Sequence, residues 1–231
     1  GLGGGFWRVF AADTVSSLGT VISTLAIQFL LIDTLAADQQ AIGLVRAAQW
    51  APYLLFGLLA GVVAERFRRK PLLIGADLVG LAVFGTIGAL ALAGRLTVPI
   101  LAGLVFVFGA VTCLSVAAYQ SYVPRLVPEH LLPESFARLE QMGQVVGSFG
   151  PVAAGSLVRF LSAPIAVLVD AISYAVSCVD LATIRTPEPP AASRTAGERR
   201  LVAELREGAR WGYRHEMLRP YALWLHTWFY G

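Results

Sequence analysis

Long runs without a charged residue dominate the pattern of hydrophobic and polar positions in this chain. Residues 14–32, 47–64, 78–94, 96–124 and 141–158 contain no Asp, Glu, Lys or Arg. Each run is close to, or longer than, the roughly 20 apolar residues that carry a helix across the hydrocarbon of a bilayer. A helix at the surface of a soluble domain shows a regular polar face, which these runs lack. The pattern therefore predicts an all-α membrane protein.

We expect six transmembrane helices in one bundle, joined by short connections. The predicted segments are residues 8–32, 41–64, 72–93, 97–120, 137–160 and 164–184. Connections as short as those at 65–71 and 94–97 predict that consecutive helices pack as antiparallel neighbours. Pro52 and Pro151 lie inside the second and fifth segments and are expected to bend them.

Two shorter segments follow the predicted bundle of residues 1–185. Residues 186–217 begin with the Pro- and Ala-rich stretch TPEPPAASRTAG and continue as a charged amphipathic helix, which predicts a cytoplasmic linker. Residues 218–231 (LRPYALWLHTWFYG) are apolar and aromatic but too short to cross a bilayer. They predict the start of a seventh transmembrane helix, whose remainder is missing from this chain.

Composition and charge agree with a membrane protein and indicate its orientation. Only 14% of residues are charged and the mean hydropathy is +0.66, whereas soluble domains are about 25% charged. With the N-terminus in the cytoplasm, most of the 18 Lys and Arg residues fall on the cytoplasmic side, and only Arg95 and Arg159 fall outside. Short cytoplasmic loops carry such an excess, so we expect both termini in the cytoplasm. No separate basic domain is present that would bind nucleic acid.

The short basic loop GVVAERFRRK, residues 61–70, lies between the second and third segments. Any short cytoplasmic loop tends to be basic, which is the simpler explanation of its charge. The loop also resembles the signature G-x-x-x-D-[RK]-x-G-[RK]-[RK] of the major facilitator superfamily. Gly61, Arg66, Arg69 and Lys70 match it, Glu65 replaces its Asp, and an arginine replaces its second Gly. The resemblance implies that this loop latches the two halves of a transporter, with Asp77 in the third segment completing the charge cluster.

A second match lies in the fifth segment, where Gly147 precedes the stretch Gly150-Pro151-Val-Ala-Ala-Gly155. This stretch resembles the G-P-x-x-G-G element of exporters and antiporters in the superfamily. Small residues around a Pro allow close packing and a bend at one point of a helix, and ordinary glycine-rich packing is the alternative explanation. Four further stretches are similar to the bacterial branch that holds macrolide-efflux and enterobactin-exporter proteins: AAQWAP at 47–52, VPRLVP at 123–128, DAISY at 170–174 and LREG at 205–208.

Ionisable residues inside predicted spans are candidates for function, because a central Asp or Arg costs about 2.5–3.5 kcal/mol to insert. Asp13, Arg46 and Asp170 are in this position. Asp13 is alternatively an interfacial residue beneath Arg8, and we expect Asp170, beside Ser173, to bond another span rather than a substrate. In the superfamily, helices one, two, four and five line the cavity. The resemblance therefore implies these cavity candidates: Asp13, Arg46, Gln49, Gln28, Tyr119, Gln120, Gln141 and Gln144.

These observations favour a secondary active exporter of small amphipathic compounds in a bacterial inner membrane, built as the N-terminal half of a major facilitator fold. Its expected partners are the lipid bilayer, a small-molecule substrate, a coupling ion that we expect to be a proton, and a C-terminal six-helix half. Residues 96–124 lack the arginine that proton-coupled drug antiporters usually carry in span four. A six-span scaffold subunit is the alternative. The chain has no nucleophile, phosphate-binding or metal motif, so we expect no enzyme activity, no cofactor and no metal site.

Overall fold

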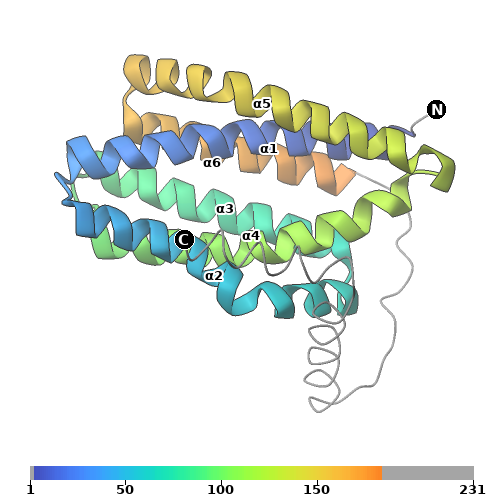
Figure 1. Cartoon of the computed structure of the whole chain (residues 1–231). Helices are drawn as coiled ribbons and strands as arrows, with labels where there is room; N and C mark the ends of the chain where they lie inside the picture. The colour runs from blue at the N-terminus through green and yellow to red at the C-terminus, as the bar shows by residue number, and fades with distance from the viewer. Residues whose placement is uncertain (1–2, 184–231) are drawn as a thin grey trace, which may run out of the picture. The chain divides into compact units, whose positions relative to one another are not determined.

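The computed structural model describes residues 3–183, apart from some side chains near the end of the second helix and that of Arg125. This part of the chain is helical almost throughout (Figure 1). Its elements are α1 (Gly4–Phe29), a π-helical turn (Leu30–Thr34), α2 (Gln39–Arg66), α3 (Arg69–Leu92), α4 (Val98–Leu126), a 3-10 turn (Glu129–Leu131), α5 (Leu132–Leu161) and α6 (Ala163–Thr183). These bounds lie close to the six predicted segments. The predicted linker at 186–217 and the predicted seventh span at 218–231 lie outside the described residues.

Four of the described helical segments are both apolar and long enough to cross a membrane. They are Gly4–Thr34, Arg69–Leu92, Val98–Pro124 and Ala163–Thr183. The other two helices, α2 and α5, are equally long but more polar, and α5 carries Glu134, Arg138, Glu140 and Arg159. The all-α membrane class is therefore confirmed.

The helices pack in a pattern that repeats within the bundle. The closely packed pairs are α2 with α4, α3 with α4, α3 with α6, α1 with α6, and α1 with α5. Exchanging α1 with α4, α2 with α5 and α3 with α6 leaves this set of pairs unchanged. The bundle is thus two three-helix repeats packed around the α3–α6 contact, and Figure 1 shows α2 and α5 on opposite sides of it.

The prediction that helices joined by a short connection are close neighbours is wrong for α1 with α2 and for α2 with α3, which are not among the closely packed pairs. A short connection holds only the adjoining ends of two helices together. Which helices touch along their length depends on the side chains that face each other. In this chain, α2 diverges from α1 and packs against α4 (Figure 1).

Glycines set the closest helix contacts. A Cβ atom on Gly80 of α3 would lie 2.8 Å from the ring of Tyr174 of α6, and one on Gly109 of α4 would lie 2.6 Å from the main-chain oxygen of Gln49 of α2. Small residues let two membrane helices approach this closely, and the resulting van der Waals contact holds them together. Gly19 of α1 lies against α6 in the same way. A closely packed glycine is therefore found in three of the helix pairs: α3 with α6, α2 with α4, and α1 with α6.

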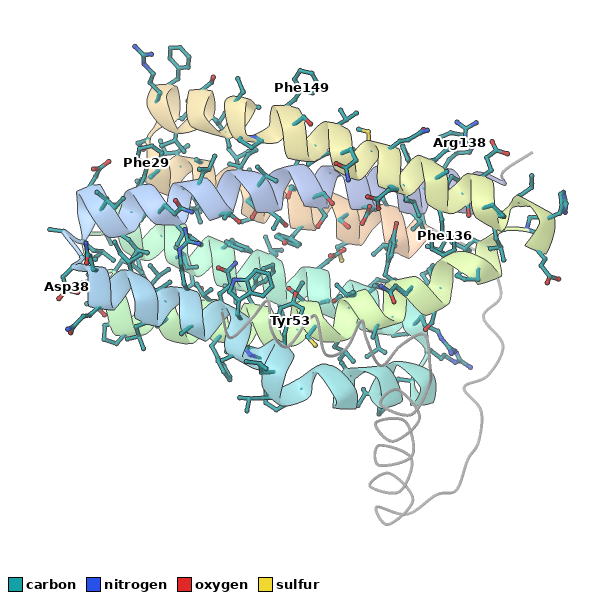
Figure 2. The ribbon with its side chains drawn as sticks, in the orientation of Figure 1. Phe29, Asp38, Tyr53, Phe136, Arg138 and Phe149 are labelled. Carbon is teal, nitrogen blue, oxygen red and sulfur yellow. The ribbon has the colours of Figure 1, made fainter. Side chains whose placement is uncertain are left out.

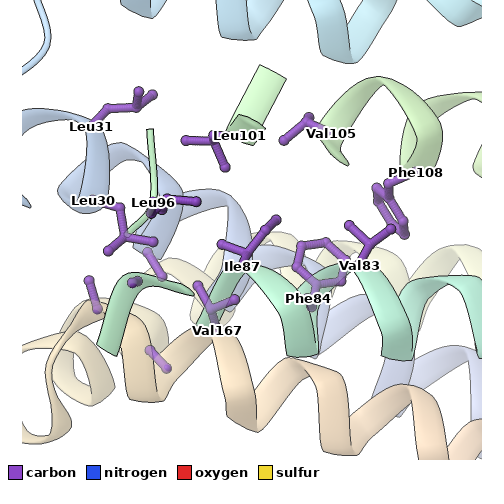
Figure 3. Close-up of a cluster of buried hydrophobic side chains, with 14 of the residues drawn as sticks. Leu30, Leu31, Val83, Phe84, Ile87, Leu96, Leu101, Val105, Phe108 and Val167 are labelled. Carbon is purple, nitrogen blue, oxygen red and sulfur yellow. The ribbon is translucent and has the colours of Figure 1, made fainter. Parts of the chain in front are cut away.

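Two clusters of buried apolar side chains lie toward opposite ends of the bundle. The larger cluster joins helices at the end where α1 meets α2 and α3 meets α4. Figure 3 shows part of it, including Leu30, Ile87, Leu101, Phe108 and Val167. The smaller cluster lies toward the other end and consists of Val9, Ala12, Leu73, Ala118, Tyr122, Val123 and Leu181.

We predict that Gly109→Ala destabilises the contact between α2 and α4. The new methyl group would meet a main-chain oxygen, which cannot rotate away, so the helices must separate at a cost of about 1–3 kcal/mol. Thermal unfolding in detergent, followed by tryptophan fluorescence, should show a lower midpoint. Gly103→Ala is the matched control, because Gly103 is on the same helix and has open space at its Cβ position. Equal midpoints for the two variants would contradict this account of the packing.

Candidate functional site

A cavity of about 660 Å³ lies between α1, α3, α4, α5 and α6. Its wall comes from residues 9–21 of α1, 73–77 of α3, 108–120 of α4, 136–147 of α5 and 174–181 of α6. Most of these residues lie in the half of the bundle nearer the N-terminal end of α1, on the side where Phe136 is labelled in Figure 2. Exposed residues such as Gln120 and Glu140 form part of the wall, so the cavity reaches the surface of the described bundle.

Three carboxyl groups line this cavity, from Asp13, Asp77 and Glu140. Among the described residues that form its wall, none is Lys, Arg or His. The wall also carries hydroxyl groups on α1 and α4 and apolar side chains between them. The cavity therefore combines negative charge, hydrogen-bonding groups and apolar surface, which is a chemistry suited to an amphipathic ligand with a positive charge.

Each of the three carboxyl groups has a polar neighbour. Asp77 accepts a hydrogen bond of 2.7 Å from the hydroxyl of Ser177 on α6. Glu140 accepts one of 2.9 Å from the side-chain amide of Gln144. The phenol of Tyr119 on α4 lies close to the carboxyl group of Asp13. These neighbours position the acids without neutralising them.

A line of polar side chains runs along the face of α6 that meets α1 and α3. Asp170, Ser173, Tyr174 and Ser177 follow the spacing i, i+3, i+4, i+7, so they share one face of the helix. The hydroxyl of Tyr174 lies 3.1 Å from that of Thr20 on α1. The Tyr174 ring stacks on Phe84 of α3, with centroids 5.6 Å apart and planes at 4°. We call Asp170, Ser173, Tyr174 and Ser177 the polar seam of α6.

The structure places the predicted cavity residues in two groups. Asp13, Tyr119 and Gln120 form part of the cavity wall. The remaining candidates are not among the described lining residues: Gln28, Arg46, Gln49, Gln141 and Gln144. Arg46 and Gln141 are exposed at the surface of the described bundle. Gln49 borders a separate void of about 10 Å³, together with Thr20 and Ser23 of α1.

The basic loop contacts the C-terminal end of α6. Lys70 donates a hydrogen bond of 3.0 Å to the main-chain oxygen of Ala182, and Arg8 donates one of 2.7 Å to that of Thr183. Positive groups at the end of a helix satisfy its free carbonyl groups and its negative dipole end. Arg69 is buried, with 7% of its surface exposed. The side chains of Glu65 and Arg66, which carry the rest of the predicted latch, lie outside the described part.

The glycine and proline element of α5 has one face against α1. A Cβ atom on Gly150 would lie 3.1 Å from a methyl group of Val21 on α1, whereas Gly147 and Gly155 have open space at that position. Pro151 is exposed. The element therefore provides close packing at a single residue and leaves small residues on its other face.

Sequence reasoning did not select Glu140, Tyr174 or Ser177 as site residues. Glu140 lies inside the predicted segment 137–160, directly before the charge-free run that begins at residue 141, and no motif contains it. Tyr174 and Ser177 could have been found from the helical spacing of polar residues that begins at Asp170. Within the described residues, no group of three or more His, Cys, Asp or Glu side chains is arranged to hold a metal ion.

Apolar helices of spanning length around a polar cavity define this chain as a multi-pass membrane protein of the transporter class. Comparison with known proteins identifies the family. The family model described as "Transmembrane secretion effector" (MFS_3) matches residues 4–223. The chain therefore belongs to this family of major facilitator superfamily transporters, which are not enzymes.

Individual relatives are similar at low identity. Macrolide efflux protein A of Streptococcus pyogenes is 24% identical over 183 residues, which cover 79% of this chain and 45% of that protein. The MFS-type transporter YkuC of Bacillus subtilis is 25% identical over 187 residues, covering 79% of this chain and 42% of YkuC. The MFS-type transporter Rv0037c of Mycobacterium tuberculosis is 30% identical over 125 residues, covering 53% of this chain and 28% of Rv0037c. The chain thus spans less than half the length of these relatives.

We predict that a cysteine on the cavity wall is reactive and that one in the larger apolar cluster is not. Thr112→Cys and Leu101→Cys place the thiol on the same helix, the first facing the cavity and the second fully buried. Both are made after replacing Cys113 and Cys178 with Ala, and labelling by a water-soluble maleimide in detergent is followed by mass. Labelling of Thr112→Cys alone is expected. Labelling of Thr112→Cys that is no greater than that of Leu101→Cys would contradict the assignment of Thr112 to a water-accessible cavity wall.

Proposed function

We propose that this chain is the N-terminal six-helix half of a secondary active exporter that moves cationic amphipathic compounds by alternating access. The observation that carries the proposal is the cavity of about 660 Å³, lined by Asp13, Asp77 and Glu140 with no described basic residue on its wall. The membership in a transporter family supplies the class of activity. The charge of the wall supplies the class of cargo.

All six helices cross the membrane in this proposal. Although α2 and α5 are more polar than the other four, they are 28 and 30 residues long, enough for about 40 Å at 1.5 Å per residue. Each packs lengthwise against an apolar spanning helix, α2 against α4 and α5 against α1. Their polar residues are therefore accommodated by facing the cavity or a second half rather than lipid.

A second six-helix half supplies the remaining wall. The chain spans less than half the length of its curated relatives, and two three-helix repeats within one half are a recurring plan among such carriers. The exposed side of α5, with Gly143 and Gly147 bordering the cavity, would face that half. Substrate would bind between the halves, which rock about it to open one side and then the other.

The excess of Lys and Arg in the loops on one side favours a cytoplasmic N-terminus. In that orientation the cavity lies in the cytoplasmic half of the bundle, and the larger apolar cluster closes the opposite end. The described conformation would then face inward. The Thr112→Cys variant also tests this orientation: an impermeant maleimide should label it from the cytoplasmic side in inside-out vesicles and not in right-side-out vesicles.

The carboxyl groups favour a cation because a positive charge in the cavity would interact with three acids in surroundings of low dielectric constant. Two unit charges 4 Å apart attract by about 4 kcal/mol at an effective dielectric constant near 20. An anionic cargo would meet repulsion of similar size. The similarity to macrolide efflux protein A favours a cargo that is bulky and amphipathic, which suits a cavity with apolar surface between its polar groups.

Proton exchange is the coupling that we propose, since carboxyl groups can bind either a proton or a cationic cargo. The basic loop at residues 61–70 would act as the latch of the opposite, outward-facing state, with Glu65 and Arg66 at its centre. Lys70 would have to exchange its bond to Ala182 for another partner whenever α3 moves relative to α6.

We predict that Asp13→Asn and Glu140→Gln each reduce transport of a lipophilic cationic dye far more than transport of a neutral dye of similar size. The full-length protein encoded by the reading frame is reconstituted in vesicles, and uptake is measured under an imposed pH gradient. Glu134→Gln is the matched control: Glu134 is on α5 but exposed, and it pairs with Arg138 at 2.8 Å outside the cavity.

The proposal fails if no gradient drives movement of any cationic or neutral amphipathic compound. The cation preference alone fails if the cavity variants reduce both dyes equally. Residues 1–231 expressed alone are expected not to accumulate dye, because a single half leaves the binding site without its second wall.

A further inference from the structure

Asp170 is the most deeply buried ionisable residue of the described helices. It lies in the middle of α6 with 0% of its surface exposed, and its side chain points at α1. Gly19 of α1 is so close that a Cβ atom there would overlap both the carboxyl group of Asp170 and the hydroxyl of Ser173. No side chain, cargo or bulk water can enter this contact while α1 and α6 stay together.

The hydrogen bonds of Asp170 account for only one of its two oxygens. Oδ1 accepts a bond of 2.9 Å from the hydroxyl of Ser173. Oδ2 is buried without a hydrogen-bond partner, and so is the hydroxyl oxygen of Ser23, the neighbour of the carboxyl group on α1. Ser23 is 1% exposed. Each of these two buried atoms without a hydrogen-bond partner carries a desolvation cost, and one proton shared between them would remove both.

Among the described side chains, no basic group is a neighbour of Asp170 that would compensate a negative charge. The residues that meet Asp170 from α1 are Gly19 and Ser23, both neutral, and its neighbour on α6 is the phenol Tyr174. From α3 the nearest ionisable residue is Asp77, about two turns away along the polar seam, and its charge would repel. The charged residues of α5 interact elsewhere or lie toward its ends: Glu134, Arg138, Glu140 and Arg159.

We propose that Asp170 is protonated in this conformation, with the proton on Oδ2 donated to the hydroxyl oxygen of Ser23, and that it is the coupling proton site of the carrier. This inference rests on the proposed exporter function. When α1 and α6 separate, water reaches Asp170 and the proton leaves to the solution on that side. The carboxylate takes up one proton from the solution on the other side before the helices close again, so each cycle moves one proton and leaves the protein unchanged.

The proton site is distinct from the cargo cavity, and one contact connects them. Asp170 is not on the cavity wall. Tyr174, one turn further along α6, is on the wall, and so is Thr20, whose hydroxyl group lies beside that of Tyr174. Thr20 also borders the void of about 10 Å³ beside Ser23, which has room for about one water molecule. Cargo that displaces Tyr174 or Thr20 would therefore disturb the contact that holds the Asp170 proton. This arrangement explains how proton coupling can operate although residues 96–124 lack the arginine that proton-coupled drug antiporters usually carry in span four.

Infrared spectroscopy of the full-length protein with 13C-labelled aspartate tests the protonation directly. At neutral pH we expect a C=O stretching band of a protonated, buried carboxyl group, which Asp170→Asn removes and Asp13→Asn retains. Ser23→Ala should shift the band to higher frequency, because the acid loses its hydrogen-bond acceptor, and the unchanged fold of this variant is checked by its thermal midpoint. A spectrum in which Asp170→Asn removes only carboxylate bands overturns the proposal.

Transport then tests the coupling. Asp170→Asn keeps the shape and the hydrogen bond from Ser173, so we expect it to retain exchange of labelled for unlabelled dye across vesicles without a gradient. Accumulation driven by a pH gradient should be lost. Gradient-driven accumulation equal to that of the wild type overturns the coupling role. If the wild type moves no compound at all, the proposed function fails, and the infrared bands still decide whether Asp170 is protonated.

Discussion

The close contact of α6 with α1 and α3 is the interaction on which the rest of this bundle depends. Beside the polar seam, Gly19 on α1 and Gly80 on α3 permit it, since any side chain at either position would overlap the seam. Lipid does not drive apolar helices together as water does, so close van der Waals contact has to hold them. The α3–α6 contact also relates the two three-helix repeats. The cavity is left where α1, α4 and α5 surround the seam without filling the space beside it.

Much of the fold could be predicted from the sequence, because hydrocarbon leaves a chain few options. An apolar run of about 20 residues can satisfy its main-chain groups only as a helix, so the positions of the helices follow from the charge-free runs. The pairing of the helices did not follow, because it depends on which faces carry the contact glycines. The same limit applied to the site. Asp13 and Tyr119 could be selected by residue type and position in a span, whereas Glu140 becomes a cavity residue only because α5 is turned toward α1 and α4.

The acids of the cavity wall and of the polar seam lie in two environments with different chemistry. Asp13, Asp77 and Glu140 line a space that a ligand can enter, with hydroxyl and amide groups beside them. Asp170 is enclosed by helix contacts and reaches only serine side chains. In the proposed carrier the two environments divide the work, because the cavity acids bind the cargo and Asp170 holds the coupling proton. Thr20 and Tyr174 lie between the two, and their hydroxyl groups meet at 3.1 Å.

The placement of the cavity toward one end of the helices also determines how the membrane voltage acts on the carrier. A charge crossing the whole membrane gains or loses about 2.3 kcal/mol per 100 mV. The electrical potential drops mainly across the part of the protein that conducts ions least. Water entering the cavity would bring the solution potential deep into the bundle, so most of the voltage would fall across the apolar cluster around Leu30, Ile87 and Leu101. The voltage would then act little on cargo binding. It would act mainly on the step that parts this cluster and passes the net charge across it.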